Sequence, residues 1–456
     1  MGQRPFDDIG AEFENASLGD KRRSDRWKQL GERMAQAPGD SFPDVLPPAE
    51  LEAAYRLLNN PALSTEALVG PHVAQSVARV SRESTVLVAH DSSVISYSSG
   101  EGREGLAGTP GAKQKFLAHC SLALTADERR MPLGVLALSY HVPIKTPGVK
   151  LSGRWRDHVI STYGAGLGRE QLVHLMDREA DVYELLDFLT GIGARFVVRA
   201  KARRKTKDGS VLKKLQQADA IVERSVAISR RKNTRKDNKQ SRIHPDRDAR
   251  MARLSITSCE IELPRTAKAD PSGRESITVN AVRAWEENPP EGQQPVDWLL
   301  YTSEAITSGE EVLQVVDWYR ARWRIEEYFK ALKTGCAVER RQFQDFHSLT
   351  NAMTLFVPIA WKILLLSSQS QENPDADAKT VLEEDEVEVL RRISRTPLPQ
   401  KPTVRQATLA IAALGGHLKH NGKPGWQTLA RGYEKLAARV EGWRLACSTP
   451  GGKPPG

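Results

Sequence analysis

The sequence predicts an α/β fold with helical segments at both ends of the chain. Two short apolar runs, Thr85–Asp91 and Gln171–Asp177, have the length of buried strands, and each ends in an aspartate. A long helical pattern from Ser308 to Gly335 follows later in the chain. Strands and helices in this order favour a sheet that is covered by helices on both faces.

The stretch from Ser308 to Gly335 predicts one long helix. Ser308 is a candidate N-cap with two glutamates in the first turn, and Gly335 is a typical residue to end the helix. Polar residues recur at steps of three and four, which places them on one face: Tyr319, Arg322, Glu326, Lys330 and Lys333. Such a face suits a site for metal and phosphate. A solvated charged surface is the alternative, and it is the more frequent case for an isolated helix of this kind.

Three carboxylates are candidates for one metal site. Asp91 and Asp177 end the two apolar runs, and Glu326 lies on the long helix. Carboxylates that converge repel one another unless cations lie among them, and oxygen ligands of this kind suit Mg²⁺ or Mn²⁺. Either aspartate alone would more often be structural than catalytic.

Alternation of apolar and polar residues predicts most of the remaining elements. The predicted strands are Leu117–Leu124, Pro132–Tyr140, Arg195–Val198, Ala252–Leu263, Glu275–Trp285 and Trp298–Thr302. Near the N-terminus, one predicted helix opens at Leu18 and a second ends at Asn60-Pro61. Three further predicted helices cover Trp155–Tyr163, Glu179 to about Leu189, and Ser348–Ser367.

The charge is modestly basic and unevenly distributed. The chain has 66 Lys and Arg against 57 Asp and Glu, a net charge of +9. Residues 201–250 alone carry +11, which favours a polyanionic partner, although a solvated insertion is the alternative. The four cysteines lack metal-site spacing, and no apolar run reaches the length of a membrane span. We therefore expect a cytoplasmic protein without membrane contact.

One ordered motif points to a known family. Tyr, Arg, Glu and Lys follow one another with two, three and six residues between them: Tyr319, Arg322, Glu326 and Lys333. Other matching strings are LGDKRR from Leu18, DREAD from Asp177, RFVVRAK from Arg195, and DWLLYTSE, which contains Trp298. With these strings, the chain resembles the DDE transposases of bacterial cut-and-paste insertion sequences, in the group with a Y-R-E-K signature (the IS-four family). The resemblance extends from about Leu18 to about Leu436.

The resemblance implies a three-part organisation. A ribonuclease H-like catalytic core is expected over residues 71–345, interrupted by a basic, mostly β insertion over 201–295. A helical domain over 1–70 would bind DNA ends, and a helical domain over 346–456 would form a dimer.

The resemblance also implies roles for individual residues. Asp91, Asp177 and Glu326 would be the catalytic ligands of two Mg²⁺ or Mn²⁺ ions per active site. Trp298 would stack on a flipped base, and the signature residues would hold the adjacent phosphates. The remaining DNA-binding candidates are cations of the core and of the N-terminal helices: Lys330, Arg199, Lys201, Arg22, Arg23, Arg26 and Arg56. The alternative for Trp298 is a core or edge tryptophan, and the alternative for the N-terminal arginines is that they are ordinary surface charges.

The implied reaction is a series of phosphoryl transfers: nicking at the element's end, hairpin formation, hairpin opening and strand transfer. The implied partners are double-stranded DNA, as element ends and as target, and a second copy of the chain in a paired-end complex. Two other classes remain open: a DNA-binding regulator with weak catalysis, and a metal-dependent nuclease of the same fold.

Overall fold

The computed structural model describes residues 9–97, 102–106, 114–142, 153–201, 204–206, 209–218, 222–228, 247–418 and 422–448. The chain divides into two compact units. The first consists of Met1–Arg154, Ile160–Leu167 and Trp323–Gly456, and the second consists of Trp155–Val159 and Gly168–Arg322.

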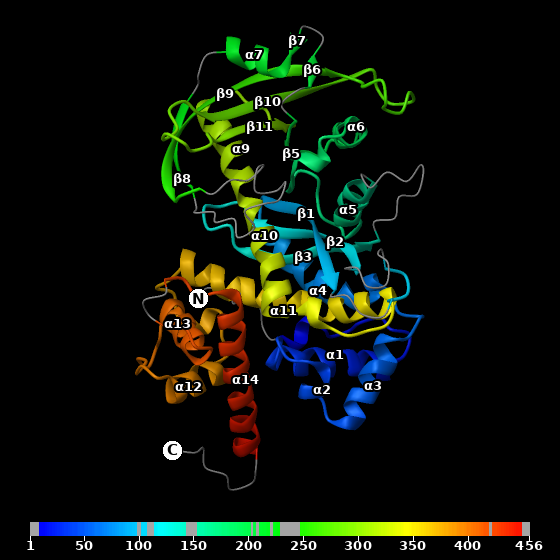
Figure 1. The fold of residues 1–456 in the computed structure, drawn as a ribbon, viewed down its shortest axis with the longest axis vertical. Coiled ribbons are helices and arrows are strands. Elements are labelled where there is room, and N and C mark those ends of the chain that lie inside the picture. The colour runs from blue at the N-terminus through cyan, green and yellow to red at the C-terminus, as the bar shows by residue number, and fades with distance from the viewer. Residues whose placement is uncertain are drawn as a thin grey trace. The chain divides into compact units, whose positions relative to one another are not determined.

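Helices begin the first unit: η1 Gly10–Glu12, α1 Lys21–Gln36, α2 Phe42–Val45, α3 Pro48–Leu58 and α4 Thr65–Val80 (Figure 1). The carboxylate of Asp20 caps α1 and accepts from the N–H of Arg22 at 2.8 Å. A Cβ on Gly31 would lie 2.6 Å from the ring of Phe13, so α1 and the chain after η1 pack too closely for any other residue. The two predicted N-terminal helices correspond to α1 and α3.

An antiparallel sheet with the order β3-β2-β1 lies next in the first unit. Its strands are β1 Val86–Tyr97, β2 Gln114–Thr125 and β3 Pro132–His141. The helices α4 and α11 (Phe346–Glu372) both pack on β3. By length and composition α11 resembles a membrane span, contrary to expectation, but its apolar window is wholly buried inside the protein. This is the pattern of a core helix.

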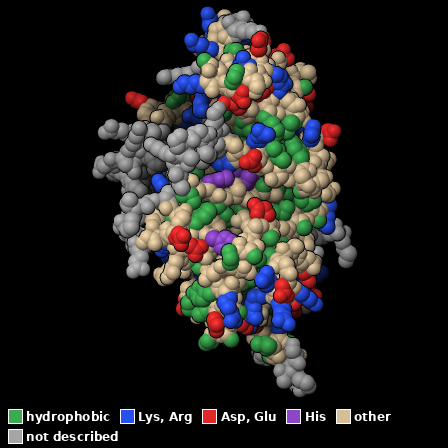
Figure 2. Space-filling view, turned by 90° about the vertical axis from the view of Figure 1, so that its right-hand side faces the viewer, with side chains coloured by type: hydrophobic (Ala, Val, Ile, Leu, Met, Phe, Trp, Pro, Cys, Tyr) green, Lys and Arg blue, Asp and Glu red, His purple; other side chains and the backbone are tan. Residues whose placement is uncertain are grey.

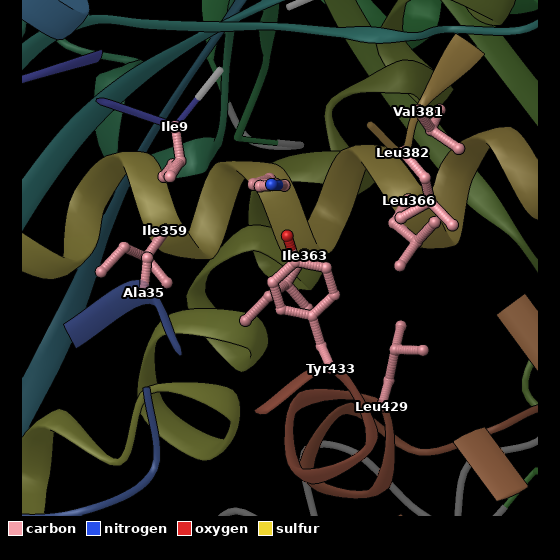
Figure 3. Close-up of a pocket in the computed structure, with 10 residues that line it drawn as sticks. Ile9, Ala35, Ile359, Ile363, Leu366, Val381, Leu382, Leu429 and Tyr433 are labelled. Atoms are coloured by element: carbon pink, nitrogen blue, oxygen red, sulfur yellow. The ribbon is translucent and has the colours of Figure 1, made fainter. Parts of the chain in front are cut away.

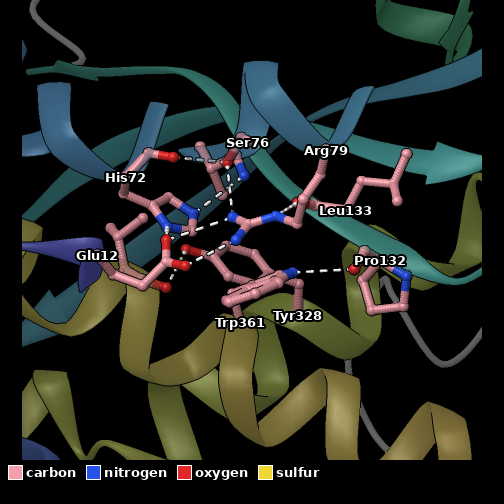
Figure 4. Close-up of polar contacts among 10 residues, drawn as sticks. Glu12, His72, Ser76, Arg79, Pro132, Leu133, Tyr328 and Trp361 are labelled. Atoms are coloured by element: carbon pink, nitrogen blue, oxygen red, sulfur yellow. Dashed lines mark hydrogen bonds and ion pairs between the residues drawn. The ribbon is translucent and has the colours of Figure 1, made fainter. Parts of the chain in front are cut away.

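A buried polar network joins η1, α4 and β3 (Figure 4). Glu12 Oε2 lies 2.5 Å from Nδ1 of His72, and Oε1 accepts from Nη1 of Arg79 at 2.7 Å. The N–H of Val135 donates to Nε2 of His72 at 3.1 Å, so Nδ1 carries the ring proton and donates to Glu12. Arg79 also donates to a backbone carbonyl of β3, and its guanidinium lies 4.1 Å from the ring centre of Trp361. The network fixes η1 to α4 and β3.

A second buried cation, Arg341, fixes the loop after α1. Its guanidinium donates to the carbonyl oxygens of Pro38 at 2.7 Å and Cys336 at 2.8 Å, and also to that of Asp40. The same group lies 4.3 Å from the ring centre of Phe356. Burial lowers the pKa of Arg341 to about 10.

The C-terminal part of the first unit is helical: α10 Trp323–Lys330, a π-turn η3 Ala331–Gly335, η4 Val338–Arg340, η5 Ala378–Thr380, α12 Glu384–Ile393, α13 Val404–Leu414 and α14 Trp426–Ser448. A Cβ on Gly432 would lie 1.8 Å from the carbonyl oxygen of Ile411, so α13 and α14 are in backbone contact. An apolar pocket of about 380 Å³, open solvent included, lies between α11 and α14, with Ile363 and Leu429 in its wall (Figure 3).

The second unit is built on a sheet with the order β4-β5-β11-β10-β9-β8. Its strands are β4 Leu172–Met176, β5 Arg195–Arg199, β8 Val222–Ile228, β9 Arg250–Pro264, β10 Ser276–Glu286 and β11 Asp297–Thr302. The parallel pair β4 and β5 is connected through η2 Arg178–Ala180 and α6 Tyr183–Gly191, and the other pairs are antiparallel. The smaller elements are β6 Lys205–Thr206, β7 Gly209–Ser210 and α7 Val211–Gln217. The helix α9 Gly309–Ala321 packs on β5, β9 and β10, and α5 Gly153–Gly164 has residues in both units.

The predicted α/β class with helical ends is confirmed, but two predicted elements differ. The strand at Asp91 does not end there, because pairing with β2 continues to Tyr97 opposite Gln114. The predicted single helix is interrupted at Arg322, whose N–H bonds to the carbonyls of Tyr319 and Arg320 instead of one four residues back. Ser308 is the N-cap of α9 as predicted, and Glu311 completes a capping box with it. Half of the basic stretch 201–250 lies outside the described residues.

Candidate active site

Asp91 lies in the middle of β1, directly opposite Cys120 of β2. Its side chain is half-buried, and Oδ1 accepts from the N–H of Ser92 at 2.8 Å. Burial raises the pKa of the Cys120 thiol, and the Asp91 carboxylate adds to the rise. The thiol therefore stays protonated beside this carboxylate.

Glu326 lies in the first turn of α10, and α10 packs against β1. Its side chain is half-buried like that of Asp91. The first unit thus brings two of the three predicted ligands onto elements in contact with each other.

Lys333 follows Glu326 in the π-turn and is tied to the same strand. Its Nζ donates to the carbonyl oxygen of Val94 at 2.5 Å. Burial lowers the pKa of Lys333, and the Glu339 carboxylate acts in the opposite direction. Lys330 remains exposed, with Nζ 5.3 Å from the ring centre of Trp323. The predicted helix is thus interrupted at Arg322, before Glu326, and a π-turn that contains Lys333 follows Lys330.

Asp177 belongs to the second unit, at the carboxyl end of β4 as predicted. It caps η2 and accepts from the N–H of Glu179 at 2.8 Å. The register of β4 and β5 pairs Met176 with Val198, so Asp177 follows the end of β4 at the level of Arg199, the last residue of β5.

An aromatic pair from β11 and α9 lies in the second unit. The rings of Trp298 and Tyr319 meet edge to face with centres 6.1 Å apart. Trp298 is half-buried, whereas Tyr319 is only 6% exposed. The phenol predicted to hold a phosphate is therefore largely covered by protein.

Arg178, which was not among the predicted site residues, lies near Arg199, Tyr319 and Asp177. Partial burial and the positive charge of Arg199 lower its pKa, while Tyr319, Asp297 and Asp177 act in the opposite direction. Its position directly after Asp177 in the DREAD string was the available signal. Trp323, at the start of α10, was also not among the predicted site residues. It is an exposed aromatic side chain, with 51% of its surface accessible.

Lys201 has a structural contact in the second unit. Its N–H donates to the Asp181 carboxylate at 2.6 Å, and its Nζ donates to the Asp181 carbonyl at 3.2 Å. Arg204 forms an ion pair with the same carboxylate. The last residue of the DREAD string therefore organises the chain after β5.

The N-terminal cations lie on the surface of α1 and α3. Arg22 and Arg23 are exposed, and Arg26 is half-buried. Arg56 is paired with Glu52 at 3.2 Å, with both side chains about 70% exposed. The face drawn in Figure 2 carries Lys and Arg interspersed with Asp and Glu rather than one basic surface.

Three transposase family models match consecutive segments of the chain. "Transposase DNA-binding" matches residues 9–63, "Transposase DDE domain" matches residues 148–357, and "Transposase Tn5 dimerisation domain" matches residues 358–451. The α/β core is thus of the ribonuclease H-like class that DDE transposases share.

A solved structure described as a piggyBac transposase synaptic complex with hairpin DNA matches at 10% identity and a TM-score of 0.40, over 97% of this chain and 80% of the other. That likeness is too distant to inform the site. The family models, in contrast, agree in kind and in order with the motifs in the sequence. The chain belongs to the DDE transposases, metal-dependent enzymes that cleave DNA, and it resembles the Tn5 transposase.

Proposed function

We propose that this transposase excises a DNA element by cut and paste through a hairpin intermediate and joins it to target DNA. The observation that carries the proposal is the presence of DNA-binding, DDE and dimerisation segments in one chain. Excision requires two ends to be held together, and a dimer makes the second end an intramolecular partner at high effective concentration. The complex would therefore contain two chains and two ends, in the cytoplasm.

Asp91, Asp177 and Glu326 are the proposed metal ligands. All three are half-buried carboxylates, a donor set that suits Mg²⁺ or Mn²⁺ and leaves room for water and phosphate oxygens. Two such ions, when bound, activate the attacking oxygen and stabilise the leaving oxygen. The N–H groups of Ser92 and Glu179 hold one oxygen of each aspartate in place.

Trp298 is the proposed stacking residue for the hairpin step. Tyr319 supports one edge of the indole, and the half-buried ring keeps some accessible surface. Stacking of a base on an aromatic side chain contributes about 1–3 kcal/mol, enough to offset part of the unstacking cost in a bent strand. Arg199, Arg322 and Lys333 are the proposed phosphate contacts.

The surface cations of α1 are the proposed contacts to the element's end. Arg22 and Arg23 are exposed, and both lie in the segment that matches the DNA-binding family. Contacts of this kind position a protein on the backbone, while sequence is read by groups that reach the base edges.

A cleavage assay on a supercoiled plasmid with two candidate ends tests the proposal. Wild-type protein with Mg²⁺ should give nicked DNA, then hairpin-ended breaks on a denaturing gel. Asp91→Ala, Asp177→Ala and Glu326→Ala should each abolish nicking while end binding persists in a gel-shift assay. Trp298→Ala should nick but accumulate few hairpins. Breaks that form without any hairpin would contradict the proposed course.

A further inference from the structure

Two serine–histidine pairs cross between β1 and β2 on the same face of the sheet. Register places His90 opposite Ser121 and Ser92 opposite His119. The hydroxyl of Ser121 lies 2.8 Å from Nδ1 of His90, and that of Ser92 lies 2.9 Å from Nδ1 of His119. The two imidazoles are stacked, with centres 6.4 Å apart and planes 20° apart. Both histidines and Ser121 are fully buried.

Ser92 has a buried cation as an additional partner. Nε of Arg154 donates to the Ser92 hydroxyl oxygen at 3.0 Å, and Arg154 is only 7% exposed. Because the guanidinium can only donate, the hydroxyl accepts from Arg154 and its own proton is available to Nδ1 of His119. Two buried groups from different elements therefore restrain the Ser92 side chain.

The restraint on Ser92 reaches Asp91 through the main chain. Successive strand residues point to opposite faces, so Asp91 faces away from the histidines. The N–H of Ser92 nevertheless donates to Asp91 Oδ1 at 2.8 Å. Any rotation of the Ser92 backbone would shift this donor, and Arg154 and His119 oppose that rotation.

We infer that Ser92, with His119 and Arg154, is a positioning residue for the Asp91 carboxylate. The inference rests on the proposed function, in which Asp91 is a ligand of the divalent ion. Ser92 fixes the direction of one carboxylate oxygen and thereby orients the other for the ion. Groups in the layer behind metal ligands change metal affinity or activity by about 10–100-fold when they are removed.

The second pair offers a matched control. Ser121→Ala removes a buried serine–histidine contact of nearly the same length in the same ladder. Ser121 pairs with His90, whereas Ser92 directly follows Asp91 and its own N–H donates to Asp91 Oδ1. Both alanine variants should lose a similar amount of thermal stability. Only Ser92→Ala should change the response to metal.

The experiment measures Mn²⁺ binding to the full-length protein by electron paramagnetic resonance, and in parallel the Mg²⁺ concentration that gives half-maximal nicking. We expect Ser92→Ala to weaken Mn²⁺ binding by about 10-fold and to raise the required Mg²⁺ similarly. Ser92→Thr keeps the hydroxyl and should restore most of both. Ser121→Ala should bind Mn²⁺ as the wild type does.

Several results would overturn the inference. If Ser92→Ala binds Mn²⁺ normally while Asp91→Asn binds it poorly, Asp91 is a ligand but Ser92 does not position it. If Ser121→Ala weakens binding as much as Ser92→Ala, the effect is general loosening of the sheet. If Asp91→Asn itself binds Mn²⁺ normally, the proposed role of Asp91 fails, and the inference fails with it.

Discussion

Glu12→Gln is expected to destabilise the first unit strongly. The substitution keeps the size of the side chain but removes the negative charge between Arg79 and His72, which are 7% and 1% exposed. Nδ1 of His72 carries a proton because Nε2 accepts from a backbone N–H, so His72 and Arg79 both donate to Glu12. The glutamine amide can accept from one of these donors with its oxygen, but its N–H groups must face the other. Removing one partner of a buried ion pair typically costs about 3–5 kcal/mol.

The pH dependence of Glu12→Gln has a defined sign. Burial raises the pKa of Glu12, but His72 and Arg79 together hold it below the ordinary value of 4.5. The carboxylate therefore stabilises the folded state above that pH, and the contribution is lost as the pH falls through the lowered value. Burial also lowers the pKa of His72 from 6.5, so acid favours unfolding at this site as well. The difference between wild type and variant should shrink in acid.

Urea unfolding monitored by tryptophan fluorescence measures the loss of free energy. Glu14→Gln is the control, because Glu14 is 52% exposed in an ion pair with Lys28, where the expected cost is about 0–1 kcal/mol. Adding Arg79→Met to Glu12→Gln should recover part of the loss, since an uncompensated charge is then no longer buried. A cost for Glu12→Gln no larger than that of Glu14→Gln would refute the reasoning.

Three further predictions concern other regions. Burial and the nearby Asp40 carboxylate raise the pKa of Glu434 to about 7, so the folded protein should lose stability as the pH rises from 4.5 to about 7. Glu434→Gln should therefore melt at a higher temperature than the wild type at pH 8 and at the same temperature at pH 4. An unchanged melting curve at pH 8 would contradict this. Gly432→Ala should force α13 and α14 apart and reduce dimer formation in sedimentation experiments, whereas Gly442→Ala, with open space around it, should be neutral or stabilising by about 0.5–1 kcal/mol. Neutralising the cations of residues 201–250 should reduce the salt slope of DNA binding by about 0.9 per lost phosphate contact, and an unchanged slope would show that the stretch does not touch DNA.

Local patterns predicted the elements well where burial alone determines them. The strands β2 and β3 and the β9–β10 pair follow from alternating apolar residues, and the start of α9 follows from Ser308 and Glu311. The break at Arg322 was not predictable from periodicity, because the residues around it keep helical spacing and only the backbone hydrogen bonds change. Asp91 was expected at a strand end because polar residues follow it, yet those residues continue the strand by pairing with β2.

The surroundings of the site depended on contacts distant in sequence. The DREAD and Y-R-E-K strings identified the candidate ligands, but nothing local to Ser92 indicates that it meets His119 across the sheet or Arg154 from a helix. Tyr319 appeared as a polar residue on a helical stripe, whereas packing against Trp298 covers it. Periodicity assigns a face to each residue, and tertiary packing decides whether solvent or protein lies on that face.

The Arg341 contacts have a consequence for engineering. Arg341 lies in the segment that matches the DDE family, but it donates to the carbonyls of Pro38 and Asp40 in the DNA-binding segment. Every residue has a backbone carbonyl, so these hydrogen bonds depend on the path of the loop and not on its sequence. Residues 9–63 should therefore be exchangeable between relatives whose loop has the same length and path, which would allow chimeras with altered end specificity. Inserting or deleting one residue there would move the Pro38 and Asp40 carbonyls away from the buried guanidinium, which would keep only the acceptor on Cys336.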